Sequence, residues 1–441
     1  MFHSEAVSVA KRLPALVAGL AAIALAATVS TASASSKAQY GVEDDAWLEV
    51  GTTKMSSLQQ RLATLDRLGV DVVRYTLRWD HIAPVRPEQP ANPDDPAYNW
   101  SLADALLDGL RAHGIDVVLT FWGTPVWANG WQKPNWAPRS PSALALFATA
   151  AAKRYPWVHK WEVWNEPNQL GGLNPNSPRL YVQRLLNPTV AALHALDPKN
   201  IVAGGATSPR ATRTALSAVV FMRGMRRAGA HFDVYSHHPY PRWFGRGRPE
   251  TPLQTLPCTR WLTMASLQCL LRDVKRNFGS KHIWLTEYAY KTNPPDLHRG
   301  VSPALQARYL AEAARRVYQA PHVDLLINFL IRDEPVVGRW ASGFFTARDL
   351  VKPSFFSFML PLAEISRRDA RTTLWGQVRP RSGPQPYLLQ RRSRGRWLSV
   401  GRVSITGDRG FFSRQVYARP GWRFRIWSLL DGTFSPALVV R

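Results

Sequence analysis

Two glutamates stand at the ends of predicted buried strands, in positions that suit the hydrolysis of a glycosidic bond. Pro167 has no N–H for a β-ladder, so we expect it to end one strand and to leave Glu166 at its tip. Glu287 follows the second strand in the same way. Such a pair can divide the roles of proton donor and of nucleophile or base, whereas either glutamate alone would be an ordinary surface residue. The two runs are Trp164-Asn165-Glu166-Pro167-Asn168 and Ile283-Trp284-Leu285-Thr286-Glu287.

The elements that must position these glutamates alternate between short apolar runs and segments of helical period. Strands alternating with helices predict parallel pairing, and eight units predict a closed (β/α)8 TIM barrel over residues 38–368. In such a barrel both glutamates fall on the face where the strands end. The expected strands are 39–42, 70–75, 115–121, 158–163, 201–203, 232–235, 283–286 and 323–329. The expected helices are 57–68, 102–112, 142–154, 178–196, 211–229, 262–278, 303–319 and 354–365.

The sequence pattern changes after about residue 370. Short strand candidates separated by glycines, prolines and Asp-Gly replace the helical period, which predicts a small C-terminal antiparallel β-sandwich over residues 371–441. This region holds 14 arginines, no lysine and two aspartates, so it is strongly basic. It could hold an acidic polymer or a cell surface, or serve only as a structural lid. The arginine content could also reflect genome composition alone.

The first 34 residues have the pattern of a secretory signal peptide. Lys11 and Arg12 precede an apolar stretch from 13 to 29, and Ala32-Ser33-Ala34 is a small-residue cleavage site. An uncleaved membrane anchor is the alternative. We therefore expect a secreted or cell-envelope location, where Cys258 and Cys269 could form one disulfide or remain two thiols.

The formal net charge of +25 invites comparison with nucleic-acid-binding proteins, but an exported chain without such a motif argues against that partner. No cysteine or histidine cluster has metal-ligand spacing, and no glycine-rich phosphate loop is present. We therefore expect no metal and no cofactor, and a monomer that acts on a polysaccharide or oligosaccharide.

Four motifs in order along the chain resemble the retaining glycoside hydrolases of clan A, with families thirty-nine and five as the nearest. The resemblance covers about 330 residues, and the ordered set is more specific than Asn-Glu-Pro alone. It implies a barrel with the acid/base on strand four and the nucleophile on strand seven. The motifs are Arg74 after Val72-Val73, Trp164-Asn165-Glu166-Pro167, His238-Pro239-Tyr240, and Thr286-Glu287.

The resemblance assigns roles to these residues. Glu166 would be the acid/base and Glu287 the nucleophile, while Asn165 would hold the sugar 2-hydroxyl. Arg74 and Tyr240 would hydrogen-bond Glu287. His238 would shape the wall near both carboxylates, because strand pleating sends the adjacent histidine at 237 the opposite way.

Aromatic residues suit a saccharide groove because sugar C–H faces stack on rings. Trp122 and Trp127, after the third strand, are candidates, although core packing is the alternative. Many clan members carry a tryptophan at the end of strand eight, where this chain has Phe329, so Trp340 in the next loop is expected to supply that ring.

The sequence thus favours a secreted retaining glycosidase that cleaves O-glycosidic, β-configured bonds of a polysaccharide or glycoconjugate. The alternative from another class is a non-catalytic carbohydrate-binding protein of the cell envelope on the same scaffold.

Overall fold

The structure is a computed structural model that describes residues 37–52, 54–245, 248–336 and 339–441. These residues pack as one compact unit. The predicted signal peptide over residues 1–34 lies outside the described residues. No helix in the described part of the chain combines the length and apolar character needed to span a membrane.

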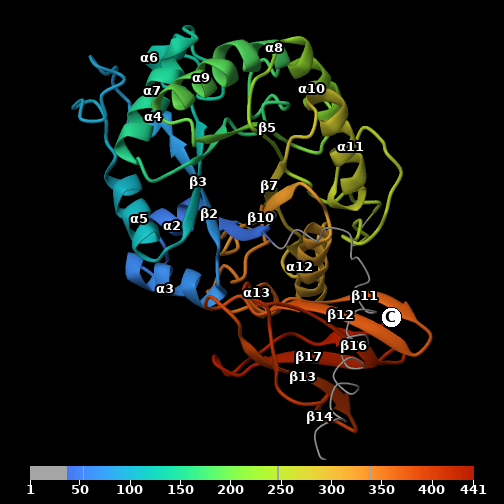
Figure 1. The fold of residues 1–441 in the computed structure, drawn as a ribbon. Helices are drawn as coiled ribbons and strands as arrows, with labels where there is room; N and C mark the ends of the chain where they lie inside the picture. The colour runs from blue at the N-terminus through green and yellow to red at the C-terminus, as the bar shows by residue number, and fades with distance from the viewer. Residues whose placement is uncertain (1–36, 53, 246–247, 337–338) are drawn as a thin grey trace, which may run out of the picture. The chain divides into compact units, whose positions relative to one another are not determined.

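Eight parallel strands close into a barrel, which confirms the predicted (β/α)8 architecture (Figure 1). The first strand pairs with both the second and the last, so the sheet has no open edge. All eight predicted strands are present. Their bounds are β1 Gln39–Glu43, β2 Val72–Arg78, β3 Asp116–Trp122, β4 Lys160–Val163, β5 Ile201–Thr207, β6 Val234–His237, β7 Ile283–Tyr288 and β10 Val323–Phe329.

The helices surround the barrel, and some differ from the prediction. The helix predicted over 178–196 is interrupted by a wider π turn, η1 (Val182–Leu186), between α8 (Pro178–Tyr181) and α9 (Asn187–Leu196). The helix predicted from 211 begins only at Ala218, where the Ser217 side chain caps it. The other main helices are α3 Leu58–Leu68, α5 Ser101–Ala112, α7 Ser142–Arg154, α10 Ala218–Arg227, α11 Leu267–Phe278, α12 Pro303–Tyr318 and α13 Pro353–Met359.

The barrel interior is layered. One buried cluster fills the region near the strand starts with apolar side chains, and its members include Val72, Val118, Val234 and Trp284. Two residues further along each strand, pleating returns the side chain to the same face. Those positions hold Arg74, Thr120, Ser236 and Thr286, all buried. A polar layer therefore lies directly above the apolar one, toward the strand ends.

The C-terminal region forms two antiparallel sheets, as predicted, with β11-β12-β16 in one and β14-β13-β17-β18 in the other. The closing helix predicted to reach residue 365 is wrong, because α13 ends at Met359 and the chain then enters β11, which pairs with β12. Tyr387 stacks on Phe412 between the sheets at 4.2 Å. The sandwich arrangement stays a prediction. The bounds are β11 Leu362–Arg368, β12 Arg371–Gln377, β13 Pro386–Ser393, β14 Arg396–Ser399, β16 Phe411–Tyr417, β17 Arg423–Ser428 and β18 Thr433–Phe434.

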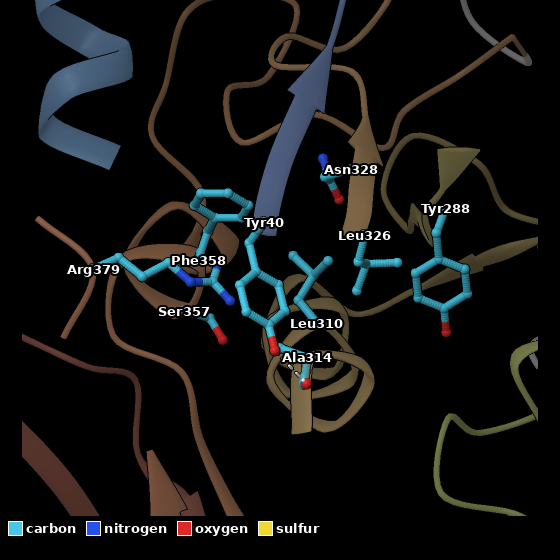
Figure 2. Close-up of a pocket in the computed structure, with 9 residues that line it drawn as sticks. All are labelled: Tyr40, Tyr288, Leu310, Ala314, Leu326, Asn328, Ser357, Phe358 and Arg379. Carbon is cyan, nitrogen blue, oxygen red and sulfur yellow. Dashed lines mark hydrogen bonds between the residues drawn. The ribbon is translucent and has the colours of Figure 1, made fainter. Parts of the chain in front are cut away.

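Arginines of this region contact the barrel where its strands begin. The Arg379 guanidinium lies 4.0 Å from the ring centroid of Tyr40 in β1 and 4.4 Å from that of Phe358 (Figure 2). Tyr40 in turn donates to the carbonyl of Ala314 at 2.9 Å. Arg409 forms an ion pair of 3.1 Å with Asp71, directly before β2. The C-terminal sheets therefore adjoin the face opposite to the strand ends.

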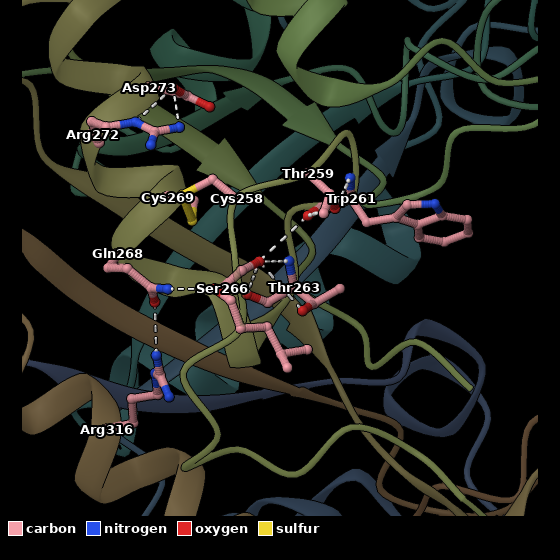
Figure 3. Close-up of a disulfide and its surroundings, with 11 residues drawn as sticks. Cys258, Thr259, Trp261, Thr263, Ser266, Gln268, Cys269, Arg272, Asp273 and Arg316 are labelled. Carbon is pink, nitrogen blue, oxygen red and sulfur yellow. Dashed lines mark hydrogen bonds and ion pairs between the residues drawn. A yellow bond between two sulfur atoms is a disulfide. The ribbon is translucent and has the colours of Figure 1, made fainter. Parts of the chain in front are cut away.

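A disulfide joins Cys258, in the loop after β6, to Cys269 in the first turn of α11 (Figure 3). The same loop is held by hydrogen bonds around Trp261, whose carbonyl accepts from Ser266 and whose N–H donates to Thr259. The disulfide thus ties this part of the loop to the start of α11.

Candidate active site

Arg74 is the centre of the polar layer. It lies on β2, is 1% exposed, and donates to four side chains. Its Nε atom lies 2.7 Å from Glu162, and Nη1 lies 2.6 Å from Glu43 and 3.0 Å from Glu287. Its Nη2 atom donates to the Asn165 amide oxygen at 2.8 Å. One rigid cation therefore orients a carboxylate at the strand ends and the neighbour of Glu166.

The pKa values of two carboxyl groups beside Arg74 shift in opposite directions. Burial is the largest influence on Glu162 and raises its pKa, but the charges of Arg74 and His238 and the hydrogen bonds of Ser236 and Thr286 together outweigh burial, so the net pKa falls below the usual value. Burial raises the pKa of Glu43 well above its usual range, and the Arg74 charge does not offset it. The surroundings of Glu162 thus favour its anionic form beside Arg74, whereas burial of Glu43 favours its protonated form.

Hydroxyl groups complete the environment of Glu162 inside the barrel. Thr120 donates to its Oε2 at 2.9 Å, and Ser236 donates to its Oε1. Ser236 and Thr286 lie 2.6 Å apart through their hydroxyls. This buried carboxylate thus has partners on both oxygens, which a charge in an apolar barrel requires.

Glu287 lies on β7 and is 7% exposed. Arg74 contacts its Oε1, and the hydroxyl of Tyr240 donates to its Oε2 at 2.8 Å. Burial and the nearby carboxylates raise the pKa of Tyr240 well above its usual value, so its hydroxyl stays protonated and acts as a donor. Glu287 is therefore held as an aimed carboxylate, in the arrangement that the resemblance implied for Arg74 and Tyr240.

Glu166 is placed by a strained turn and not, as predicted, by a strand that Pro167 ends. Strand β4 stops at Val163, and both Trp164 (φ 75°) and Glu166 (φ 45°) adopt left-handed backbone conformations. Such conformations in non-glycine residues require support from the surroundings. The Glu166 N–H donates to the Ala206 carbonyl at 2.9 Å. Its side chain is 22% exposed, more than that of Glu287.

Two neighbours hold this turn. Gln169 donates from Nε2 to the Glu166 Oε2 atom. Gly172 packs so closely that a Cβ there would lie 2.2 Å from the Glu166 carbonyl oxygen. The indole of Trp164 donates to the Gly172 carbonyl at 2.8 Å, which closes the turn from the other side.

His238 lies between the two glutamates. Its Nδ1 atom is 3.2 Å from Glu166 and 3.5 Å from Glu287. Burial lowers the pKa of His238, but the two carboxylates outweigh burial and raise it overall. The adjacent His237 turns away, as predicted, and binds Thr207 and the Leu262 carbonyl. Its burial lowers its pKa to about 3, so it is neutral.

The two carboxyl groups converge beside His238. One carboxylate oxygen of Glu166, one of Glu287 and one ring nitrogen of His238 lie within 4.8 Å of one another. Carboxyl groups about 5–5.5 Å apart allow direct attack on a sugar, whereas about 6.5–9.5 Å leaves room for a water. The same three groups could bind a cation, but Arg74 already places a positive charge 3.0 Å from Glu287 and opposes a second one.

The predicted aromatic residues divide into two groups. Tyr240 and Trp340 lie 5.0 Å apart by ring centroids, and Phe329 meets Trp340 edge-on at 5.1 Å. These three rings form a surface beside Glu287. Trp122, half-buried, lies under the Arg78 guanidinium at 4.8 Å and near Trp164.

Trp127 belongs to the packing beneath its loop. It meets Trp79 edge-on at 5.7 Å and donates from its indole to the Ala83 carbonyl at 2.8 Å.

The sequence reasoning missed Glu162, Glu43 and Gln169. A signal was available for Glu162, because a charged residue in the middle of a predicted buried strand needs an internal partner. Glu43 directly follows the first predicted strand, as Glu287 directly follows the seventh. Nothing in the sequence indicated that Gln169 turns back onto Glu166.

Solved glycoside hydrolases share this fold. A glucosidase from Croceicoccus marinus is 13% identical, with a TM-score of 0.56 over 86% of this chain and 93% of that one. A family 39 glycoside hydrolase from Bacteroides cellulosilyticus WH2 is 15% identical, with a TM-score of 0.56 over 86% and 79%. CelM2, a bifunctional glucanase-xylanase from a metagenome library, is 11% identical, with a TM-score of 0.50 over 87% and 94%.

No family model matches the chain, and no curated protein matches its sequence. At 11–15% identity the structural likeness establishes the fold alone. The resemblance to barrel glycoside hydrolases drawn from the sequence is thus confirmed at the level of the fold.

Proposed function

We propose that this protein is a retaining glycoside hydrolase that cleaves O-glycosidic, β-configured bonds of a polysaccharide or glycoconjugate. The observation that carries the proposal is that Glu166, in the turn after β4, and Glu287, on β7, converge at the strand-end face of the barrel, with one carboxylate oxygen of each within 4.8 Å of the other. That separation favours direct attack by one carboxylate over activation of a water between them. The fold shared with solved glycosidases supports the same conclusion.

In the first step the Glu287 carboxylate attacks the anomeric carbon while the Glu166 carboxyl gives its proton to the leaving oxygen. The bond to the leaving group breaks as the ester bond to Glu287 forms. Arg74 and Tyr240 hold Glu287 in line for attack. In the second step Glu166 removes a proton from water, which displaces Glu287 and restores both groups.

Asn165 completes the site in this proposal. Arg74 binds its amide oxygen, which leaves its amide nitrogen as the group that can donate to a substrate. A hydrogen bond from that nitrogen to the sugar 2-hydroxyl strengthens as charge develops in the transition state. Trp340 and Phe329 supply the ring surface beneath the sugar.

We further propose that the protein is secreted or held at the cell envelope and acts as a monomer without a metal, a cofactor or a nucleic-acid partner. The N-terminal leader pattern supports export. The disulfide between Cys258 and Cys269 supports an oxidising compartment. We keep the predicted division of the chain at residues 368–371 and the β-sandwich as parts of this proposal.

The test is hydrolysis of a panel of aryl β-glycosides by the wild-type protein and by two variants. Glu287→Gln should lower kcat/KM by at least about 10⁴-fold, because no nucleophile remains. Glu166→Ala should retain activity on activated aryl leaving groups, and added azide should restore turnover as a β-glycosyl azide. The exposed Glu88→Gln is the matched control and should behave as wild type.

Product analysis by NMR decides the stereochemistry, since retention gives the β-anomer first. An α-anomer would overturn the double-displacement proposal. Equal rates for wild type and Glu287→Gln, or no turnover of any glycoside, would favour the non-catalytic carbohydrate-binding alternative.

A further inference from the structure

A cleft of about 700 Å³ adjoins the carboxyl pair. Tyr240 links the cleft to the carboxyl pair, because its hydroxyl donates to Glu287 and the residue also lines the cleft, together with Trp340. Its walls come from the loops that follow β5, β6, β7 and β10, which is the face that carries the two glutamates. The lining residues are Pro209, Arg210, Thr212, Tyr240, Pro241, Arg242, Trp243, Trp261, Ala289, Lys291, Arg299, Glu334, Arg339 and Trp340.

The lining is far more basic than the chain as a whole. Five of these fourteen residues are cationic and one is acidic. In the complete sequence 56 of 441 residues are lysine or arginine and 31 are acidic. A general arginine bias would give this surface fewer than two cations, so composition alone does not account for the charge of the cleft.

The cationic residues lie on several of the loops that line the cleft, and most of them are exposed to solvent. Arg210, Arg242 and Arg299 are exposed, and no carboxylate of the described residues forms an ion pair with any of them. Lys291 is different, because Asp296 pairs with it at 3.2 Å. The excess positive charge therefore belongs to arginines, whose planar groups bind carboxylate, sulfate and phosphate through two hydrogen bonds at once.

Aromatic rings accompany these cations. The Arg242 guanidinium lies 5.7 Å from the Trp261 ring centroid, and Lys291 lies 5.1 Å from that of Trp340. The disulfide loop holds Trp261 in position (Figure 3). A ring for the sugar face beside a guanidinium suits an acidic sugar, because a charged substituent gains a charge-assisted hydrogen bond there and a neutral hydroxyl gains a weaker one.

We propose that this cleft binds anionic sugar residues, bearing carboxylate, sulfate or phosphate groups, next to the bond that is cleaved. This inference rests on the proposed glycosidase function and names the substrate class for the same site. The charged residues of the substrate lie along Arg210, Arg242 and Arg299, and the scissile bond lies between Glu166 and Glu287.

The test measures binding to the full chain carrying Glu287→Gln, so that the ligand is not consumed. Intrinsic tryptophan fluorescence reports the titration. The probes are hexasaccharides of hyaluronan for carboxylate, of chondroitin sulfate for added sulfate, and of cellulose as the neutral arm, with a glycerol-phosphate hexamer for phosphate. We expect at least one anionic probe to bind at least tenfold tighter than the cellulose probe at 50 mM salt, and the difference to shrink at 500 mM salt.

Three charge-matched double variants identify the surface responsible. Arg210→Gln combined with Arg242→Gln should remove most of the preference for the anionic probe. Arg223→Gln with Arg226→Gln on the exposed side of α10 removes equal charge elsewhere and should preserve it. Arg392→Gln with Arg396→Gln tests the C-terminal region and should also preserve it.

The proposal is overturned if the cellulose hexasaccharide binds as tightly as every anionic probe, or if the C-terminal pair lowers binding as much as the cleft pair does. If a thymidine hexanucleotide binds as tightly as the best acidic saccharide, the cleft recognises negative charge alone and not an acidic sugar. Hydrolysis of aryl glycosides by the wild-type protein is measured in a separate assay. Activity without the anionic preference refutes this inference alone, and the preference without activity refutes the proposed function alone.

Discussion

Arg74 donates from Nε to the buried Glu162 at 2.7 Å. This contact fixes the orientation of the guanidinium, whose other nitrogens donate to residues near the strand ends, Glu287 and Asn165 among them. Glu162 lies entirely inside the barrel and touches no position that a substrate could occupy. The orientation of Glu287 therefore depends on a carboxylate one layer beneath it.

This relationship predicts unequal effects for two similar substitutions. Glu162→Gln removes the anion that balances Arg74, so we expect a loss of about 3–5 kcal/mol in the free energy of unfolding. Burial raises the pKa of Glu43 well above its usual range and so disfavours its anion, and Glu43→Gln should therefore cost far less. Urea unfolding at pH 7 measures both. Equal destabilisation by the two variants would show that Glu43 is ionised as well.

Gly172→Ala should impair the acid/base step by displacing Glu166. The new Cβ would lie 2.2 Å from the Glu166 carbonyl oxygen, so the turn must shift. A misplacement of about 1 Å can cost about 10²-fold in rate. The loss should be larger for alkyl or sugar leaving groups, which need protonation, than for dinitrophenyl. Gly171→Ala is the control, because its Cβ meets nothing within 4 Å. A uniform loss across leaving groups would contradict this role for the turn.

Tyr240→Phe should lower kcat on aryl glycosides by about 10–100-fold, the value of one hydrogen bond of about 1.5–3 kcal/mol to a charged group. The hydroxyl donates to Glu287 at 2.8 Å, and its loss leaves Arg74 and His238 as the partners of that carboxylate. Tyr309→Phe, a buried tyrosine on α12, serves as the control. An unchanged kcat would mean that Tyr240 only lines the cleft.

His237 should make the fold sensitive to acid. Its pKa is about 3 in the folded protein and about 6.5 in the unfolded chain, so folding favours the neutral form. A depressed pKa contributes stability above pH 6.5 that is lost as the pH falls toward 3. Between pH 7 and pH 5 this amounts to about 2 kcal/mol.

Thermal or urea unfolding across this range measures the effect. His237→Gln should be less stable at pH 7 but should show a flatter dependence on pH than the wild type. The exposed His231→Gln should keep the wild-type slope. If His237→Gln retains the full slope, other groups cause the acid sensitivity.

The sequence allowed the barrel to be predicted because its signals are local. Each strand is an apolar run bounded by a glycine, a proline or a helix end, and all eight were found. The break at Val182–Leu186 was not predicted, although Pro188 is a local signal for it, because proline lacks the N–H that a continuous α-helix needs and lies just after the π turn. The helix expected from 211 starts late, because Thr212 and Ala215 form a bridge instead.

The residues of the candidate active site likewise divide into those that the sequence predicts and those that it does not. The structure brings together Glu166, Glu287, Arg74, Asn165, His238 and Tyr240, all of which motifs marked. Glu43 and Glu162 carry no motif, and their importance comes from burial around one guanidinium, which depends on the closed barrel. Trp127 was chosen for its residue type, and the packing of its loop places it against Trp79.

The contacts of Arg379 with Tyr40 and of Arg409 with Asp71 tie the arginine-rich sheets to the rim where the strands begin. Glu166 and Glu287 lie at the opposite rim, where the strands end. We propose that a polymer bound by those sheets would lie on the side of the barrel away from the two glutamates. The sheets would then hold the protein in place, and the glycan that is cleaved would approach from the opposite side.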